Sequence, residues 1–170
     1  MERFECTLAF EDALPPCDSR VATIHGYWRS IRPAGAAIPG RQHFDPAAVP
    51  RLLPMVRLYD VHRDPWRFRY RLVGTELVRT VGRDLTGRWF HETAPAGHAA
   101  RSYGNLVFVA SDNGICYRRG FPVFSATDKD HLAAERIMLP FARDGHTVDI
   151  ILALTVLHPA AAASPLHPAA

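Results

Sequence analysis

Hydrophobic and polar residues alternate most regularly over residues 66–72, Trp-Arg-Phe-Arg-Tyr-Arg-Leu. A period of two places the aromatic and aliphatic side chains on one face of a β-strand and Arg67, Arg69 and Arg71 on the other. Other apolar runs predict further strands at residues 55–62, 115–124, 132–141 and 148–157. The turns between the last three are short, and short connections pair strands antiparallel.

Two longer segments have helical spacing instead. In the first, Asp18 is a candidate N-cap, and an apolar stripe runs from there to Pro33 through Val21, Ile24, Trp28 and Ile31. Such a stripe covers a sheet in its own chain or pairs with a second copy. We predict the second arrangement, a homodimer that these four side chains hold together.

The second helix is predicted over residues 93–113, with Asn113-Gly114 as its stop signal. Its apolar face would carry Tyr103, Leu106, Val107 and Ala110. Shorter helices are predicted after Asp45 and at residues 76–81, the latter closed by Gly82. The elements together predict an α+β domain with one antiparallel sheet and helices on one face.

Composition fits one globular domain, because the chain has 170 residues, of which 48% are hydrophobic and 22% charged. Residues 1–17 are predicted to be a loosely attached arm, and residues 18–51 hold the flanking helices and a loop. Residues 52–157 form the main domain, and the Pro/Ala-rich residues 158–170 are predicted to be a disordered tail.

Charge and hydropathy limit which classes of partner and which cellular compartment we expect. The net charge of +3 is too small to favour nucleic acid, and no apolar run approaches the roughly 20 residues that cross a membrane. The start of the chain lacks the pattern of a secretory signal, and the 3 cysteines have no C-x-x-C spacing. We therefore expect a cytoplasmic protein without membrane or nucleic-acid partners.

Several short segments in this order are similar to a known family. They are Trp28-Arg29-Ser30-Ile31-Arg32, Phe44-Asp45-Pro46, Leu53-Pro54, Asp60-Val61, the residues 68–75 Phe-Arg-Tyr-Arg-Leu-Val-Gly-Thr and the residues 82–87 Gly-Arg-Asp-Leu-Thr-Gly. With the element order, they make residues 52–157 resemble a PAS domain, closest to a bacterial subfamily of short stand-alone PAS proteins.

The resemblance implies a five-stranded sheet in the spatial order 2-1-5-4-3, with a cavity between the sheet and the helices. It also implies a sensory module that binds a small molecule and signals by contact with an output protein, which the sequence does not identify. Two alternatives stay open: a ligand-free structural dimerisation module, and an enzyme on a cone-shaped α+β fold. Fold resemblance fixes architecture better than function.

The residues predicted to contact the ligand are those that the pattern turns inward, with two arginines nearby: Trp66, Phe68, Tyr70, Arg101, Tyr103, Val107, Tyr117 and Arg136. Phenols beside an arginine would favour a polar or carboxylate-bearing ligand over a hydrocarbon. The row of Arg67, Arg69 and Arg71 is interpreted as a solvated face, with an acidic partner as the alternative.

No motif for catalysis or a metal site is present. His91-Glu92 lacks the second histidine of a zincin, and no serine sits in a G-x-S-x-G turn, so we predict no enzyme and no metal. The cofactor is unknown: haem held by His98 and flavin bound in the dark are both left open at low weight. A flavin photoadduct is ruled out, since no cysteine lies between residues 18 and 115.

Overall fold

The computed structural model describes residues 4–93, 99–120 and 132–159. Six antiparallel strands form a single sheet in the order β1-β4-β5-β6-β2-β3. Their bounds are β1 Phe4–Leu8, β2 Val56–His62, β3 Arg67–Val73, β4 Ile115–Gly120, β5 Leu132–Phe141 and β6 Ile150–Pro159. Apart from β1, this is the order 2-1-5-4-3 that the resemblance implies.

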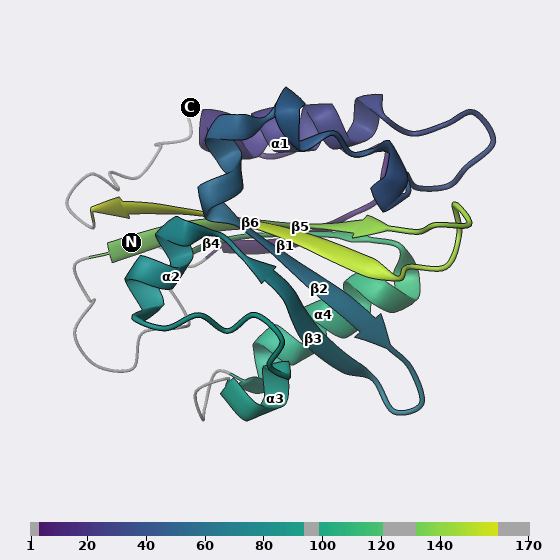
Figure 1. Cartoon of the computed structure of the whole chain (residues 1–170). Helices are drawn as coiled ribbons and strands as arrows, with labels where there is room; N and C mark the ends of the chain where they lie inside the picture. The colour runs from purple at the N-terminus through teal and green to yellow at the C-terminus, as the bar shows by residue number, and fades with distance from the viewer. Residues whose placement is uncertain (1–3, 94–98, 121–131, 160–170) are drawn as a thin grey trace.

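Helices cover both faces of this sheet (Figure 1). Helix α1 (Ser19–Ser30) lies on one face, and α4 (Ala99–Asp112) lies on the other with α3 (Phe90–Thr93). Short 3-10 helices lead from α1 into the sheet: η1 (Arg41–His43), η2 (Pro46–Ala48) and η3 (Pro50–Met55). Helix α2 (Thr75–Val81) follows β3 and contacts η3.

Helix α1 begins where the sequence predicts. The Asp18 carboxylate accepts the Arg20 backbone N–H at 2.8 Å, which satisfies one of the unpaired donors at the helix start. Val21, Ile24 and Trp28 then face the sheet, and Trp28 Nε1 donates to the backbone oxygen of Pro140 at 2.8 Å. Burial of these side chains on β5 and β6 holds the helix to its own chain.

The predicted dimer seam is therefore wrong in its residues. Val21, Ile24 and Trp28 are 0% exposed within the single chain, and Ile31 is partly buried against the same core. A side chain without exposed surface has nothing to offer a second copy. The stripe covers the sheet instead, which is the other arrangement that its spacing allowed.

The N-terminal arm contains a strand that the sequence did not predict. β1 pairs with β4 in register from Phe4 opposite Arg119 to Leu8 opposite Ile115. Residues 9–18 are left to connect β1 with α1. Hydrogen bonding to β4 supplies the order that five residues with a weak pattern lack.

Other boundaries differ from the predicted ones by a few residues. Of the predicted helix over residues 93–113, α4 covers Ala99–Asp112, Thr93 is the last residue of α3, and residues 94–98 lie outside the described part. β4 is described only to Gly120, and the predicted turn at residues 127–130 also lies outside. β6 continues through His158 to Pro159, so the predicted disordered tail begins too early; its residues 160–170 are not described.

Candidate functional site: the sheet face under helix α4

The face of the sheet that α4 covers carries polar side chains from four of its strands. Arg57 on β2, Arg136 on β5 and Arg118 on β4 all point to this side, as does Thr155 on β6. The register places Arg118 directly opposite Arg136, and Arg136 directly opposite Thr155. We call Arg57, Arg118, Arg136 and Thr155 the arginine cluster.

Hydrogen bonds join the middle of the arginine cluster. Arg136 Nε donates to the Thr155 hydroxyl oxygen at 3.1 Å, and Arg57 Nη2 donates to the same oxygen at 3.4 Å. A hydroxyl has two lone pairs, and these two donors use both of them. The hydroxyl hydrogen of Thr155, which is completely buried, is thus directed to a third group.

Burial and like charge act together on Arg136. Desolvation by burial, and then the nearby positive charges of Arg57 and Arg118, lower the pKa of its guanidinium to about 10. At neutral pH the group still carries its charge. Because the Arg136 guanidinium has lost its water and lies beside Arg57 and Arg118, a negative group placed close to it would be stabilising.

A carboxylate borders the arginine cluster on its outer side. Glu5 on the edge strand β1 lies opposite Arg118, with Glu5 Oε2 at 3.9 Å from Arg118 Nε. Cys116 lies on the same face, and burial raises the pKa of its thiol to about 12, with Glu5 adding to the effect. That thiol is protonated at neutral pH and is a poor nucleophile.

Two tyrosines continue the polar row along β2 and β3. Tyr59 lies directly opposite Tyr70, and their ring centroids are 4.9 Å apart. Burial raises the pKa of the Tyr70 phenol, and Tyr59 adds to that rise, so the phenol keeps its proton. Both rings are buried, which puts hydroxyl groups next to Arg57 on the inner face.

Helix α4 contributes one buried hydroxyl to this side. Ser102 is 5% exposed and shares its helix face with Leu106 and Val109, which are fully buried. Its Oγ has no hydrogen-bond partner among the described residues. A buried hydroxyl without a partner costs about 1–3 kcal/mol, so its position calls for a function or a bound group.

An aromatic pocket of about 310 Å³ opens at the other end of β3. Phe68 forms its floor and is fully buried, and the Tyr103 ring meets Phe68 edge to face at 5.8 Å. The Tyr103 hydroxyl donates to the backbone oxygen of Trp66 at 3.0 Å. The lining residues are Trp66, Arg67, Phe68, Phe90, His91 and Tyr103.

The structure brings some of the predicted ligand residues together and separates others. Phe68, Tyr70 and Arg136 lie on the α4 face, and Val107 is half-buried beside it. Tyr103 is 37% exposed and lines only the aromatic pocket with Trp66, because the inward face of α4 starts at Ser102, one position earlier than predicted.

Two further predictions are corrected. Arg101 is exposed and lies near the edge strand, in a hollow with Glu5, Cys6 and Thr7. Tyr117 points to the opposite face of the sheet, since it neighbours the inward Cys116 and Arg118 on one strand. It therefore belongs to the α1 face and not to the site under α4.

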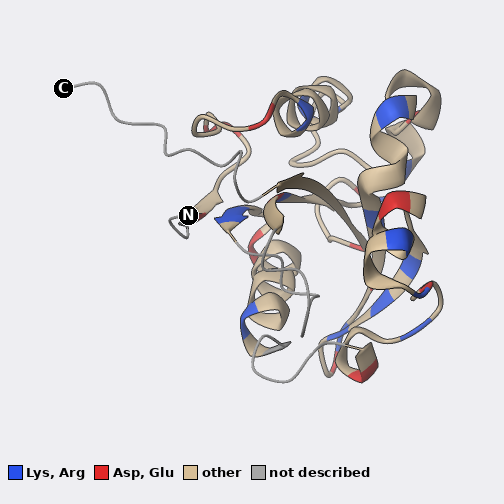
Figure 2. Cartoon of the chain, turned by 90° about the vertical axis from the view of Figure 1, so that its left-hand side faces the viewer, with Lys and Arg blue, Asp and Glu red and all other residues tan. Residues whose placement is uncertain are grey.

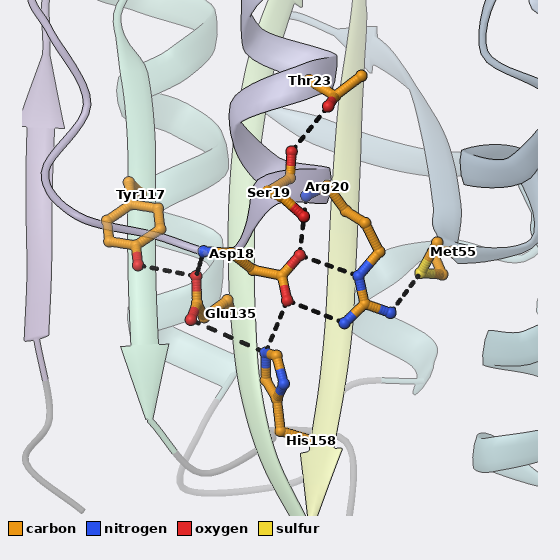
Figure 3. A network of polar contacts seen from close by, with 8 residues as sticks. All are labelled: Asp18, Ser19, Arg20, Thr23, Met55, Tyr117, Glu135 and His158. Atoms are coloured by element: carbon orange, nitrogen blue, oxygen red, sulfur yellow. Dashed lines mark hydrogen bonds and ion pairs between the residues drawn. The ribbon is translucent and has the colours of Figure 1, made fainter. Parts of the chain in front are cut away.

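On that opposite face, Tyr117 belongs to a polar network at the start of α1 (Figure 3). Glu135 Oε2 accepts the Asp18 backbone N–H at 2.8 Å and the Tyr117 hydroxyl at 3.1 Å. His158 Nε2 lies 3.7 Å from Asp18 Oδ2 and 3.8 Å from Glu135 Oε1. The hydrogen bond from Arg20 lowers the pKa of Asp18. His158 Nε2 makes no hydrogen bond at these distances, so the hydrogen bonds to Glu135 and Asp18 hold the start of α1.

The predicted arginine row is exposed, and each member has a partner within the chain. Basic positions follow one another on the β3 side of the molecule (Figure 2). Arg67 lies over the Trp89 ring at 4.0 Å, Arg69 Nε donates to the Gly87 oxygen at 3.0 Å, and Arg71 pairs with Asp60 at 2.8 Å. These contacts favour the solvated, structural interpretation over an acidic partner.

The described residues show neither a metal site nor a helix that could span a membrane. Within residues 4–93, 99–120 and 132–159, no cluster of His, Cys, Asp and Glu side chains is suited to hold a metal ion. None of the helices described is long and apolar enough to span a bilayer. His98, the predicted candidate for haem, lies outside the described residues.

Sequence reasoning missed Arg57, Thr155 and Ser102. The signal for Thr155 was present, because it is the polar member of the inward series Ile151, Ala153, Thr155, Leu157 on an otherwise apolar strand. Arg57 likewise interrupts an apolar run that starts at Met55. A charged or hydroxyl residue at an inward position of a buried strand is the mark of a polar site.

Comparisons with known proteins identify the family of this chain. A comparison with curated proteins finds no match. Among solved structures, an RNA-binding light-oxygen-voltage receptor matches with a TM-score of 0.43 and 13% identity, over 91% of this chain and 38% of that one. This chain thus spans well under half of that receptor. A family model described as a PAS domain matches residues 18–156, so the chain belongs to the PAS domain family.

Proposed function

We propose that this chain is a sensory PAS module that binds a small molecule between the sheet and helix α4 and signals by contact with another protein. The observation that carries the proposal is the polar chemistry buried on the α4 face. Arg57, Thr155 and Ser102 are buried and Arg136 is partly buried, in a region where a packed core would need only apolar side chains. A fold that buries such groups without a task would lose stability.

The aromatic pocket supports the same location. Phe68 lines the pocket, and Tyr70 follows it two residues along the same inward face of β3. Tyr59 and Arg57 then continue the row on β2. A ligand with an apolar part at Phe68 and a polar part toward Arg57 would follow this row.

The proposed route of the signal to an output protein depends on the position of strand β5. A ligand that prefers one packing of α4 on the sheet shifts the population toward that packing. β5 contacts both α4 and α1, so a change of packing on one face reaches the helix on the other. The presented surface of α1 and of its preceding residues would then differ between the two states, and an output protein would distinguish them.

Native mass spectrometry of the freshly purified full chain, with an absorption spectrum of the same sample, tests the binding part. A co-purified mass that denaturation releases is the expected result, and it would be reduced in Phe68→Ala but not in the exposed control Thr23→Ala. A chain of bare mass, with no ligand-induced rise of the unfolding temperature in a metabolite screen, would instead support the structural-module alternative. Hydrolytic turnover of a screened compound would support the enzyme alternative.

A further inference from the structure

The arginine cluster differs from an ordinary buried salt bridge in its composition. Its three guanidinium groups come from three strands, and Thr155 is the shared acceptor for two of them. Arginine has five donors and no acceptor, so the cluster is rich in donors and positive charge. Glu5 approaches it from the edge strand, on the side of Arg118.

The hydroxyl groups extend this donor character. Both lone pairs of the Thr155 oxygen are used by Arg136 and Arg57, so its hydrogen is offered onward. Ser102 adds a buried hydroxyl without a partner among the described residues, from the helix that faces the sheet. Convergent guanidinium and hydroxyl donors in a buried place match the oxygens of a carboxylate or phosphate.

We propose that the arginine cluster binds the oxyanion group of a small organic ligand. This inference deepens the proposed function, on which it rests, by naming the chemical class of the ligand. The oxyanion takes donors from Arg136, Arg57 and the Thr155 hydroxyl. The apolar part of the ligand lies along Tyr59, Tyr70 and Phe68 toward the aromatic pocket. Carboxylate and phosphate share this chemistry, and the experiment separates them.

The test measures unfolding temperature and calorimetric binding on the full chain in Tris chloride at constant ionic strength. The probes are formate, acetate, a medium-chain carboxylate, inorganic phosphate and a phosphomonoester, with the amide of each carboxylate as the neutral match. A carboxylate is expected to bind about tenfold or more tightly than its amide, because the amide leaves the buried donors unsatisfied. If the carboxylate probes bind more tightly than the phosphate probes, the oxyanion group of the ligand is a carboxylate. If the phosphate probes bind more tightly, it is a phosphate.

The test variant is Arg136→Met, and its matched control is Arg79→Met. Arg79 is exposed on α2, so both changes remove one positive charge but only the first touches the cluster. Without oxyanions, Arg136→Met is expected to unfold at the same or a higher temperature, because it relieves a buried charge. With oxyanions, wild type and Arg79→Met gain stability and Arg136→Met does not.

The inference and the proposed function fail in different ways. Equal binding of carboxylates and their amides, or equal responses of wild type and Arg136→Met to every oxyanion, would overturn the oxyanion site. A neutral co-purified ligand, together with no oxyanion response, would do the same and leave the sensory function in place. An oxyanion response lost in Arg136→Met supports the inference, even where no ligand co-purifies.

Discussion

The two faces of the sheet use polar residues in opposite ways, and strand β5 shows this within two residues. Glu135 faces α1, where it accepts two hydrogen bonds from Asp18 and Tyr117. Arg136 faces α4, where it joins two other guanidinium groups. On the α1 face, one carboxylate accepts both hydrogen bonds. On the α4 face, guanidinium donors from Arg57 and Arg136 share one hydroxyl acceptor, Thr155.

The comparison teaches that burial alone does not distinguish structure from function. Both Glu135 and Thr155 are buried. What differs is their chemistry: Glu135 is a carboxylate that accepts two hydrogen bonds, and Thr155 is a hydroxyl that two guanidinium groups share. Mutations on the α1 face should change stability without changing the response to ligands, and mutations in the arginine cluster should change the response to ligands.

The largest loss of stability is expected from Trp28→Ala on the α1 face. It removes a fully buried indole and its hydrogen bond to Pro140, which should cost about 3–5 kcal/mol of unfolding free energy. Urea denaturation measures the loss, and Thr23→Ala on the exposed side of α1 serves as the control. An unfolding midpoint that rises with protein concentration in wild type but not in Trp28→Ala would instead restore the dimer interpretation of this stripe.

A smaller loss is expected from Glu135→Ala. The change leaves the Asp18 N–H and the Tyr117 hydroxyl without their acceptor, at a cost of about 2–3 kcal/mol. Glu135→Gln keeps an acceptor oxygen and should recover part of that stability in the same urea titration. Equal losses in both variants would show that charge, and not the hydrogen bonds, stabilises the start of α1.

Thr155→Val tests the α4 face of the sheet, where a smaller loss of unfolding free energy is expected. Valine keeps the shape but removes the oxygen that Arg57 and Arg136 share, which should cost about 1–2 kcal/mol in urea. It should also weaken acetate or phosphate binding in calorimetry. The matched change on the α1 side of the same strand, Val156→Thr, should lower stability but leave binding intact. If Thr155→Val binds as wild type, the hydroxyl is no part of the site.

The smallest effect concerns pH and His25 on the α1 face. Burial, and then the charge of Arg29, lowers the pKa of His25 below 6.5. The unfolded chain therefore takes up this proton first. The stability that neutral His25 contributes is present above pH 6.5 and is lost as pH falls from there toward its folded pKa. His25→Gln should show a flatter dependence of unfolding free energy on pH in this window, and parallel profiles would contradict the assignment.

Much of the fold follows from local patterns whose physical cause is also local. The alternation over residues 66–72 predicts β3 with Phe68 and Tyr70 inward, and the Asp18 cap predicts the start of α1. Gly82 ends α2 with a φ of +82°, a conformation that glycine adopts at little cost. The strand order came from the resemblance to PAS domains, which the match over residues 18–156 confirms.

The site was harder to predict, because it depends on which strands become neighbours. Arg57 and Arg136 are far apart in the sequence and meet only through Thr155 on the strand between them. Tyr117 was assigned to the wrong face, because strand position alone gives alternation and not which side is inward. A one-position error in the inward face of α4 replaced Ser102 with Tyr103.

The strand that the arm contributes changes what the border of the sheet exposes. β1 occupies the backbone groups of β4 along five residue pairs, and at the opposite border Trp89 bridges to Arg69 on β3. A naked border strand is a template for joining sheets from different molecules end to end. Deletion of residues 1–8 would therefore replace the 5-residue border strand β1 with the 6-residue strand β4, whose bared backbone groups would favour pairing with a second molecule.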